Sequence, residues 1–211
     1  TRDAWIIWNV DPPGNKNGDC VSNSAEDFQK NVIDNIINHI PNRKKMIDIG
    51  CGNGRHSFLL SYYFDEILAI DVAPEWIEIK HKPYFLNKIH PENIKKISFL
   101  KKDFLIPWEE KFYNSFLSFS EDKFDLILFW GSFYQMINWE AALKKCYNIL
   151  SESGIIIIGE SLNKRNDRPC PSNLDVSSGS YNLGDLIEMA NLEEVTEYIF
   201  DYRVVVLRKK R

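Results

Sequence analysis

Apolar positions along the chain alternate between two spacings, which predict strands and helices in turn. Short apolar runs, typical of strands buried on both faces of a parallel sheet, occupy residues 46–49, 67–70, 97–100, 124–130 and 155–158. Apolar residues at helical spacing lie between them and predict helices over residues 26–40, from Gly54 onward, from about Pro74 and over 138–150. Strands that alternate with helices indicate an α/β fold, with a mostly parallel sheet and helices on both faces.

The last part of the chain departs from this alternation. A helix is expected near residues 183–190, followed by strands near 195–200 and 202–207. The link between these two strands is too short for a parallel crossover, so they should form an antiparallel hairpin. The sheet is therefore expected to have seven strands, with the last one antiparallel to the rest.

Three segments lie outside the alternation of predicted strands and helices. Residues 1–25 are rich in Pro, Gly, Asn and Trp and are expected to form a covering segment, which leaves residues 26–211 as the folded domain. Residues 107–122, expected to form an inserted helix and loop, and residues 161–181, expected to form a polar loop, are longer than a minimal connection requires. Long connections in compact domains are often functional. We expect a binding pocket between residues 1–25, the turn at 130–136 and the loop at 161–181.

Composition limits the kind of partner. The chain has 211 residues, enough for one domain, and its 44% hydrophobic and 27% charged content is ordinary for a globular protein. A net charge of −4 and a pI near 5.6 disfavour nucleic acid, whose partners usually have a basic face. The sequence has no apolar run of about 20 residues and no signal peptide, so no membrane association is expected and the protein is predicted to be cytoplasmic. Its four cysteines form no C-x-x-C pair, which disfavours a disulfide framework or a metal site.

The first predicted strand runs into a glycine-rich turn. From Asp48 the sequence is Asp-Ile-Gly-Cys-Gly-Asn-Gly, and a helix is expected directly after it. Glycine adopts backbone angles that other residues avoid, and it lets a ligand approach the main chain closely. The helix that follows points its free N–H groups at the same place. The turn therefore indicates a nucleotide cofactor, and its spacing to other residues decides which one.

Two carboxylates stand at suitable distances from this turn. Asp71 ends the second predicted strand about 17 residues beyond Gly54, close to the roughly 20 that precede an acid that binds ribose hydroxyls. Asp103 and Phe104 follow the third predicted strand. Open α/β sheets bind ligands at the carboxyl ends of their strands, so these residues should border one site.

Together these features resemble the class I S-adenosylmethionine-dependent methyltransferases, whose sheet is Rossmann-like. Residues 48–54 look like the first motif of that family, 124–130 like its fourth strand, and 150–154 like the turn into its fifth. The resemblance covers residues 26–209. It implies S-adenosyl-L-methionine as the cofactor, bound by Asp48, Gly50, Cys51, Gly52, Gly54, Asp71, Val72, Asp103, Phe104 and Trp130. By the same resemblance Asp71 would hold the ribose, Asp103 and Phe104 the adenine, and Asp48 the cationic methionine end.

A dinucleotide is the rival cofactor, because NAD-dependent enzymes use the same fold and an equivalent ribose acid. Two features disfavour it. Those enzymes tend to have G-x-G-x-x-G, whereas the third glycine here comes one residue sooner and Arg55 takes its place. An acid, Asp48, also precedes the first glycine, and a turn that binds an anionic pyrophosphate has less use for it.

The acceptor side carries fewer signals, because methyl transfer mainly needs the nucleophile held in line at about 3 to 3.5 Å. The resemblance places acceptor contacts after the fourth strand, which makes Tyr134 and Gln135 the candidates for substrate binding. Tyr134, Glu160 and His56 are the catalytic candidates. Glu160 follows the fifth strand, and His56 lies in the first turn of a helix, where the dipole favours the neutral ring. A base is needed only for an acceptor that loses a proton. No set of metal ligands is recognisable, so no metal is expected.

One motif suggests a different substrate. Residues 11–14 are Asp-Pro-Pro-Gly, similar to the D-P-P-Y turn of methyltransferases that act on amino groups of DNA bases. The aromatic residue is absent and residues 124–130 already supply the fourth strand, so a plain turn is expected. The sequence thus indicates methyl transfer to an oxygen or nitrogen of a small-molecule acceptor, such as a sugar or another precursor of a surface or secondary product. An RNA or protein methyltransferase, or a non-catalytic cofactor-binding module, is the alternative. The sequence sets no oligomeric state.

Overall fold

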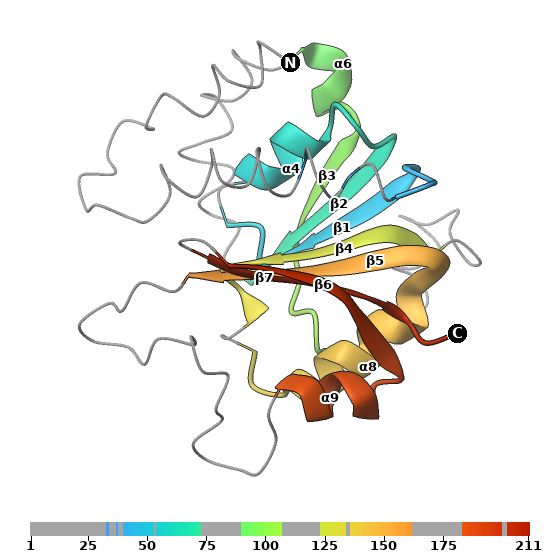
Figure 1. The fold of residues 1–211 in the computed structure, drawn as a ribbon. Coiled ribbons are helices and arrows are strands. Elements are labelled where there is room, and N and C mark those ends of the chain that lie inside the picture. The colour runs from blue at the N-terminus through green and yellow to red at the C-terminus, as the bar shows by residue number, and fades with distance from the viewer. Residues whose placement is uncertain are drawn as a thin grey trace.

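The computed structural model of the protein describes residues 33, 37, 40–52, 54–72, 90–106, 123–133, 136–161, 183–199 and 202–211. These residues form one seven-stranded sheet with the strand order β3-β2-β1-β4-β5-β7-β6 (Figure 1). The strands are β1 Lys45–Ile49, β2 Glu66–Asp71, β3 Ile97–Lys101, β4 Phe124–Trp130, β5 Leu150–Ser161, β6 Leu192–Ile199 and β7 Tyr202–Lys209.

The strand directions confirm the predicted fold. The pairs β1–β2, β2–β3, β1–β4 and β4–β5 are parallel, whereas β7 is antiparallel to both β5 and β6. The central strands β1 and β4 are buried along almost their whole length, as their apolar sequences predict. Their carboxyl ends lie side by side, because Asp48 pairs with Leu128 and Ile49 with Phe129.

Helices flank the sheet on opposite faces. Helix α4, Arg55–Leu60, covers one face, and helices α8, Trp139–Ile149, and α9, Leu183–Met189, cover the other (Figure 1). Two core clusters result: one includes Leu59, Leu60 and Met46, and the other includes Leu143 and Ile187. Helix α8 begins where sequence predicts, because the Asn138 side chain accepts a hydrogen bond from Ala141 N–H and caps it.

Three details correct the sequence-based boundaries. A short helix, α6 Pro91–Ile94, was not predicted. The turn predicted at residues 150–154 is part of β5, because Leu150 pairs with Phe124 and the extra residues of β5 are accommodated by a register shift opposite Phe124 and Leu126. Strand β6 begins at Leu192 rather than near Val195, and the Leu192 side chain is fully buried.

Several predicted segments lie outside the described residues. They are the covering segment at 1–25, the Asp-Pro-Pro-Gly turn, the helix expected from about Pro74, and the long connections at 107–122 and 162–181. Of the helix predicted over residues 26–40, the structure describes Ile33, Ile37 and Ile40. All three are buried in the same cluster as Met46 and Leu59, as expected for a helix that packs on the sheet.

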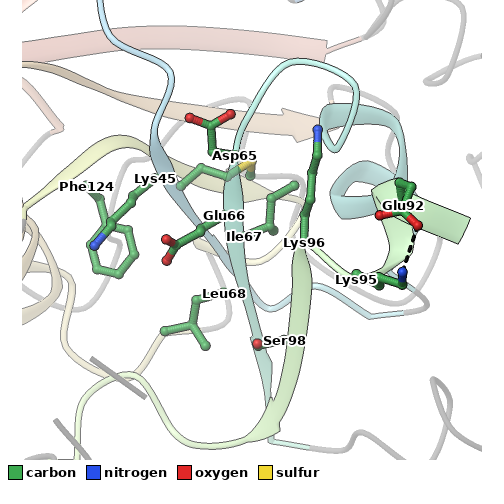
Figure 2. A pocket seen from close by; sticks show the side chains of 11 residues that line it. Lys45, Asp65, Glu66, Ile67, Leu68, Glu92, Lys95, Lys96, Ser98 and Phe124 are labelled. Carbon is green, nitrogen blue, oxygen red and sulfur yellow. Dashed lines mark hydrogen bonds and ion pairs between the residues drawn. The ribbon is translucent and has the colours of Figure 1, made fainter. Parts of the chain in front are cut away.

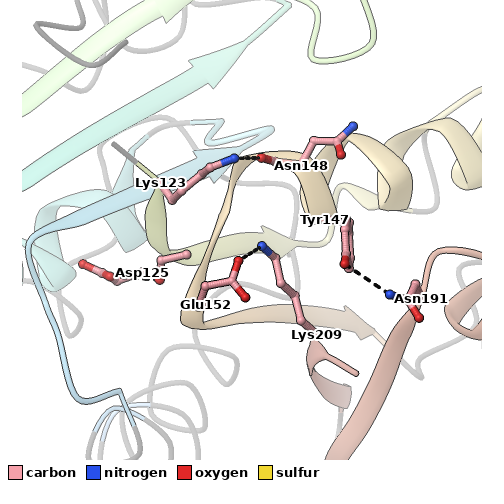
Figure 3. Close-up of polar contacts among 8 residues, drawn as sticks. Lys123, Asp125, Tyr147, Asn148, Glu152, Asn191 and Lys209 are labelled. Carbon is pink, nitrogen blue, oxygen red and sulfur yellow. Dashed lines mark hydrogen bonds and ion pairs between the residues drawn. The ribbon is translucent and has the colours of Figure 1, made fainter. Parts of the chain in front are cut away.

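The amino ends of the strands are tied together by polar contacts. The Asp125 carboxylate accepts hydrogen bonds from Lys44 N–H (3.0 Å), Lys45 N–H (3.3 Å) and the Ser151 hydroxyl (3.1 Å), which gives this residue a structural role. Beside it, Lys209 pairs with Glu152 at 2.6 Å (Figure 3). The carboxyl ends, at the opposite edge, are where the predicted site lies.

Candidate functional site

The glycine turn links β1 to α4 with a backbone that requires glycine. Gly50 and Gly52 have φ angles of +72° and +53°, in the left-handed region. A Cβ on Gly50 would lie 2.4 Å from the Ser132 Cβ, so even alanine would not fit there. A Cβ on Gly52 would meet nothing within 4 Å. The main chain at Gly52 is therefore open to a ligand.

Hydrogen bonds to neighbouring strands hold the turn in place. The N–H groups of Gly50 and Cys51 both donate to the Ile70 carbonyl oxygen, at 2.9 and 3.0 Å. The Ser132 hydroxyl, after β4, donates to the Ile49 carbonyl oxygen at 2.5 Å. The turn is thus fixed from β2 on one side and from β4 on the other, so it can act as a preformed cradle.

Asp71 joins the turn directly. Its Oδ2 atom accepts a hydrogen bond from Gly52 N–H at 2.9 Å. Asp71 ends β2 and is half-buried, while Val72 after it is 62% exposed. The acid that the sequence assigns to ribose binding and the open glycine therefore border the same space.

Asp48 lies beneath the turn and is almost completely buried, with 1% of its surface exposed. The Ser57 hydroxyl donates a hydrogen bond to its Oδ2 atom at 2.6 Å. Burial raises the pKa of Asp48 to about 7, and the nearby Asp71 carboxylate adds to the increase, whereas the Ser57 hydrogen bond opposes it. An arriving cation would favour the ionised form of this carboxyl group.

The loop after β3 brings a further carboxylate to this edge. Asp71 and Lys101 are partners across β2 and β3, and Lys102 N–H donates to the Asp71 carbonyl oxygen at 2.9 Å. The next residue, Asp103, is half-buried, and its Oδ1 atom accepts a hydrogen bond from Leu105 N–H at 2.8 Å. The Asp103 carboxylate is thereby oriented by its own loop.

Phe104 differs from its sequence-based expectation in one respect. Its ring is only 2% exposed and packs edge-on against Phe129, with 5.9 Å between ring centroids. The Lys145 ammonium lies 4.9 Å from the centroid of the same ring. The ring is therefore part of the core, which leaves the main chain of Phe104 as the part that a ligand could contact.

Trp130 and His56 meet at the carboxyl end of β4. Their ring centroids are 5.5 Å apart, and the Trp130 side chain is 8% exposed. The Trp130 ring lies against Gly159 of β5, where a Cβ would come within 2.4 Å of a ring carbon. The main chain then turns at Gly131, whose N–H donates to the Gly159 carbonyl oxygen at 2.7 Å. The structure thus brings the candidate His56 to the strand end that carries Trp130.

The remaining candidates for the acceptor side are Tyr134, Gln135 and Glu160. Tyr134 and Gln135 lie outside the described residues. The backbone of Glu160 lies in β5, paired with Arg203 of β7, which places it at the same edge of the sheet as Trp130. Their proposed roles stay predictions.

The described residues do not favour a nucleophilic cysteine or a metal site at the carboxyl ends of the strands. Burial raises the pKa of the Cys51 thiol, with smaller increases from Asp48 and Asp71, so Cys51 is a neutral thiol rather than a nucleophile. Among the residues that the structure describes, no group of three His, Cys, Asp or Glu side chains is placed to hold a metal ion. Within the same part of the chain, no helix is long and apolar enough to cross a membrane.

Three residues that matter to this geometry escaped the sequence analysis. Ser57 and Ser132 bind Asp48 and the β1 carbonyl, and Lys145 contacts the loop after β3. Each is a common surface residue type with no motif of its own. Only the spacing of Ser57, nine residues after Asp48 and inside the first turns of α4, offered a signal.

A separate cavity of about 520 Å³ lies at the other edge of the sheet (Figure 2). It is lined by the first residues of three strands, Lys45, Glu66 and Phe124, together with Lys96 and others. Lysines and acids both line it, and Lys95 and Glu92 at its rim pair with each other at 2.7 Å. It is separated from the glycine turn by the length of the strands, so it is not part of the candidate site.

Known proteins resemble this chain in sequence and in fold. Residues 40–201 match a family described as a methyltransferase domain. A probable S-adenosylmethionine-dependent methyltransferase of Saccharomyces cerevisiae is 31% identical over 62 residues, which are 29% of this chain and 21% of that relative. The matched region thus spans about a fifth of the curated relative's length.

Two solved structures show the likeness in fold. An S-adenosylmethionine-dependent methyltransferase from Clostridium acetobutylicum superimposes with a TM-score of 0.61 at 13% identity, over 98% of this chain and 95% of that chain. An O-methyltransferase from neocarzinostatin biosynthesis, solved with S-adenosyl-L-homocysteine and 1,4-dihydroxy-2-naphthoic acid, gives a TM-score of 0.55 at 13% identity. That match covers 91% of this chain and 59% of the other.

Proposed function

The chain belongs to the methyltransferase-domain family, whose cofactor is S-adenosylmethionine, and we propose that it transfers the cofactor's methyl group to an oxygen or nitrogen of a small metabolite. One observation carries the proposal. The Asp71 carboxylate accepts a hydrogen bond from the N–H of Gly52, the glycine of the turn at which an added Cβ would meet nothing within 4 Å. A ribose acid and a glycine cradle therefore form a single site.

The residues at this edge fit the cofactor. Gly52 offers open main chain for the ligand, and the Asp71 carboxylate beside it is an acceptor suited to ribose hydroxyls. Asp103 uses Oδ1 within its own loop, which leaves Oδ2 for the amino group of adenine. Asp48 is a buried carboxyl group close enough to Asp71 to interact with it electrostatically, and it suits the cationic methionine end. These assignments rest on geometry and on the family resemblance.

When bound, S-adenosylmethionine supplies a methyl group on a positively charged sulfur, which is already a strong electrophile. The work left to this chain is to hold the acceptor atom in line with that group and to keep water away. Trp130 and His56, packed together at the end of β4, are suited to form one wall of the acceptor pocket. Tyr134 and Gln135 directly follow that wall in sequence and are proposed to contact the acceptor.

A proton must also leave when the acceptor is a hydroxyl group. His56, Tyr134 and Glu160 are the candidates to receive it, and all three are placed by the sequence at the carboxyl edge of the sheet. Replacement of Tyr134 by Phe or Glu160 by Gln should then lower turnover more than cofactor affinity. Near-normal turnover in both variants would leave His56 as the candidate.

A small acceptor is favoured over a polymer. The net charge of −4 disfavours RNA, whose protein partners usually carry a net basic face. One protein of the same fold was solved with a small aromatic acid beside S-adenosyl-L-homocysteine, which is compatible with such an acceptor. A non-catalytic cofactor-binding module is disfavoured by the intact set of Asp48, Asp71 and Asp103. A methyl-transfer screen separates it from an enzyme.

Calorimetric titration tests the proposal. The protein should bind S-adenosylmethionine and S-adenosylhomocysteine, and it should not bind NAD. A screen with a radiolabelled methyl donor against sugars, amines, phenols, RNA and protein should then find transfer to a small molecule. Binding of NAD with none of S-adenosylhomocysteine would refute the cofactor, and transfer to RNA or protein alone would refute the acceptor class.

A further inference from the structure

Lys145 is a half-buried lysine on α8 whose ammonium group is directed at one short loop. Its Nζ atom donates hydrogen bonds to the carbonyl oxygens of Phe104 and Ile106, the second at 3.2 Å. The same atom lies 4.9 Å from the centroid of the Phe104 ring. Three contacts from one ammonium group thus bind both ends of the tripeptide after Asp103. In Figure 1 the segment that follows β3 runs from the sheet to α8.

The neighbours of Lys145 show that this placement is particular to it. Lys144, one residue earlier, is exposed and pairs with Glu140 on the solvent side of the helix. Ala142 and Cys146 are fully buried in the core. Lys145 therefore lies at the flank of the buried face, where its stem covers apolar surface and its charged end reaches the loop.

Burying the Lys145 ammonium group is unfavourable, and packing against Phe104 does not require a charged side chain at this position. Removal from water lowers the pKa of Lys145, although the nearby Asp103 carboxylate acts in the opposite direction. A methionine could cover the Phe104 ring equally well without placing a charge there. What the ammonium adds is two carbonyl hydrogen bonds and an attraction to Asp103.

We propose that Lys145 is a positioning residue for the cofactor: it holds the loop of residues 103–106 so that Asp103 and the main chain of Phe104 face the adenine. This inference rests on the proposed function and goes beyond it, because Lys145 itself contacts no ligand. Asp103 orients its carboxylate from within, through the Leu105 N–H, and Lys145 fixes the same loop from outside. Without Lys145, the loop loses two hydrogen bonds from α8 to its main chain.

The test compares two ligands that differ at the adenine edge. S-adenosylhomocysteine has an amino group at that edge, and S-inosylhomocysteine has a carbonyl group. Calorimetry on Lys145→Met should show the dissociation constant for S-adenosylhomocysteine raised about tenfold, and that for the inosine analogue raised less than about threefold. Lys145→Arg keeps the charge and two donors and should recover part of the loss. The matched control, Lys144→Met, should stay within about twofold of wild type.

The possible results separate the role of Lys145 from the identity of the cofactor. If wild type binds S-adenosylhomocysteine but Lys145→Met binds it equally well, Lys145 has no positioning role. If both ligands weaken equally, the loss is general destabilisation and the inference fails. Failure of wild type to bind would instead refute the proposed function. Circular dichroism confirms that each variant is folded, and if Lys145→Met is not, Lys145→Gln and Lys145→Arg provide the same comparison between ligands.

Discussion

A buried aspartate lies near each end of the parallel strands, and the two differ in how many residues donate hydrogen bonds to them. Asp125, at the amino ends of the strands, accepts three hydrogen bonds from Lys44, Lys45 and Ser151. Asp48, at the carboxyl end of β1, is hydrogen-bonded by a single residue, Ser57, and is more deeply buried. A carboxylate surrounded by donors stabilises the fold. A carboxyl group that is buried, with hydrogen bonds from one residue and a raised pKa, is suited to a positive charge that arrives from outside.

Asp125→Ala should have the largest effect and should be confined to stability. It removes three hydrogen bonds and leaves the main-chain N–H groups of Lys44 and Lys45 without this acceptor, so we expect the free energy of unfolding to fall by about 3 kcal/mol. Urea denaturation followed by circular dichroism measures it. The affinity for S-adenosylhomocysteine, measured where the variant is folded, should be unchanged, and a parallel loss of affinity would contradict the separation of the two edges.

Asp71→Ala should have the converse effect. It removes a charged acceptor for the ribose hydroxyls and for Gly52 N–H, so the dissociation constant for S-adenosylhomocysteine should rise tenfold or more, by roughly 1.5 to 3 kcal/mol. The melting temperature should change little, because Asp71 is only half-buried. Asp65→Ala, an exposed acid just before β2, is the matched control. Unchanged affinity in Asp71→Ala would remove this residue from the site.

The raised pKa of Asp48 should make both stability and ligand affinity depend on pH. Its pKa is about 7 in the folded protein against 3.8 as the ordinary value, so between about pH 4 and 7 the folded form holds the extra proton. The ligand-free protein should therefore lose stability as pH rises through that window. Affinity for S-adenosylmethionine should rise by up to about tenfold per pH unit below 7 and level off above it.

Calorimetry from pH 5.5 to 8.5 measures this profile, and Asp48→Asn is its control. The amide cannot ionise, so the dependence that belongs to Asp48 should vanish in this variant. An equal slope in wild type and Asp48→Asn would assign the titration to another group or to the ligand.

Ser57→Ala should have the smallest effect. The Ser57 hydrogen bond lowers the pKa of Asp48, so its loss should move the midpoint of the affinity profile upward by less than about one pH unit. Ser61→Ala removes another buried hydroxyl of the same region, one that donates to the Phe58 carbonyl, and should leave the midpoint in place. A shift of equal size in both variants would show that Ser57 does not act through Asp48.

Sequence predicts best those features that depend on neighbours along the chain. The strands near Met46, Ile67 and Phe124 followed from apolar runs, and the link between Asp71 and the glycine turn followed from spacing alone. The start of β5 did not, because Leu150 is a strand residue only through its pairing with Phe124.

Contacts between distant side chains were the least predictable part of the site. Lys145 and Ser132 act on loops about 40 and 83 residues away, and a lysine or serine has no pattern that announces such a partner. The Phe104 ring shows the same limit, because its burial against Phe129 depends on how two strands and a helix come together. Pairwise tertiary packing, rather than local propensity, decides these details.

The close approach of Trp130 to Gly159 also constrains how the sequence can change over evolutionary time. With tryptophan at 130, any side chain at 159 would overlap the ring, so substitutions at 159 are blocked. Once a smaller residue stands at 130, alanine at 159 becomes tolerable, and the tryptophan cannot then return. The two positions are therefore epistatic, and the order of mutation determines which pairs of residues descendants of this chain can carry at 130 and 159.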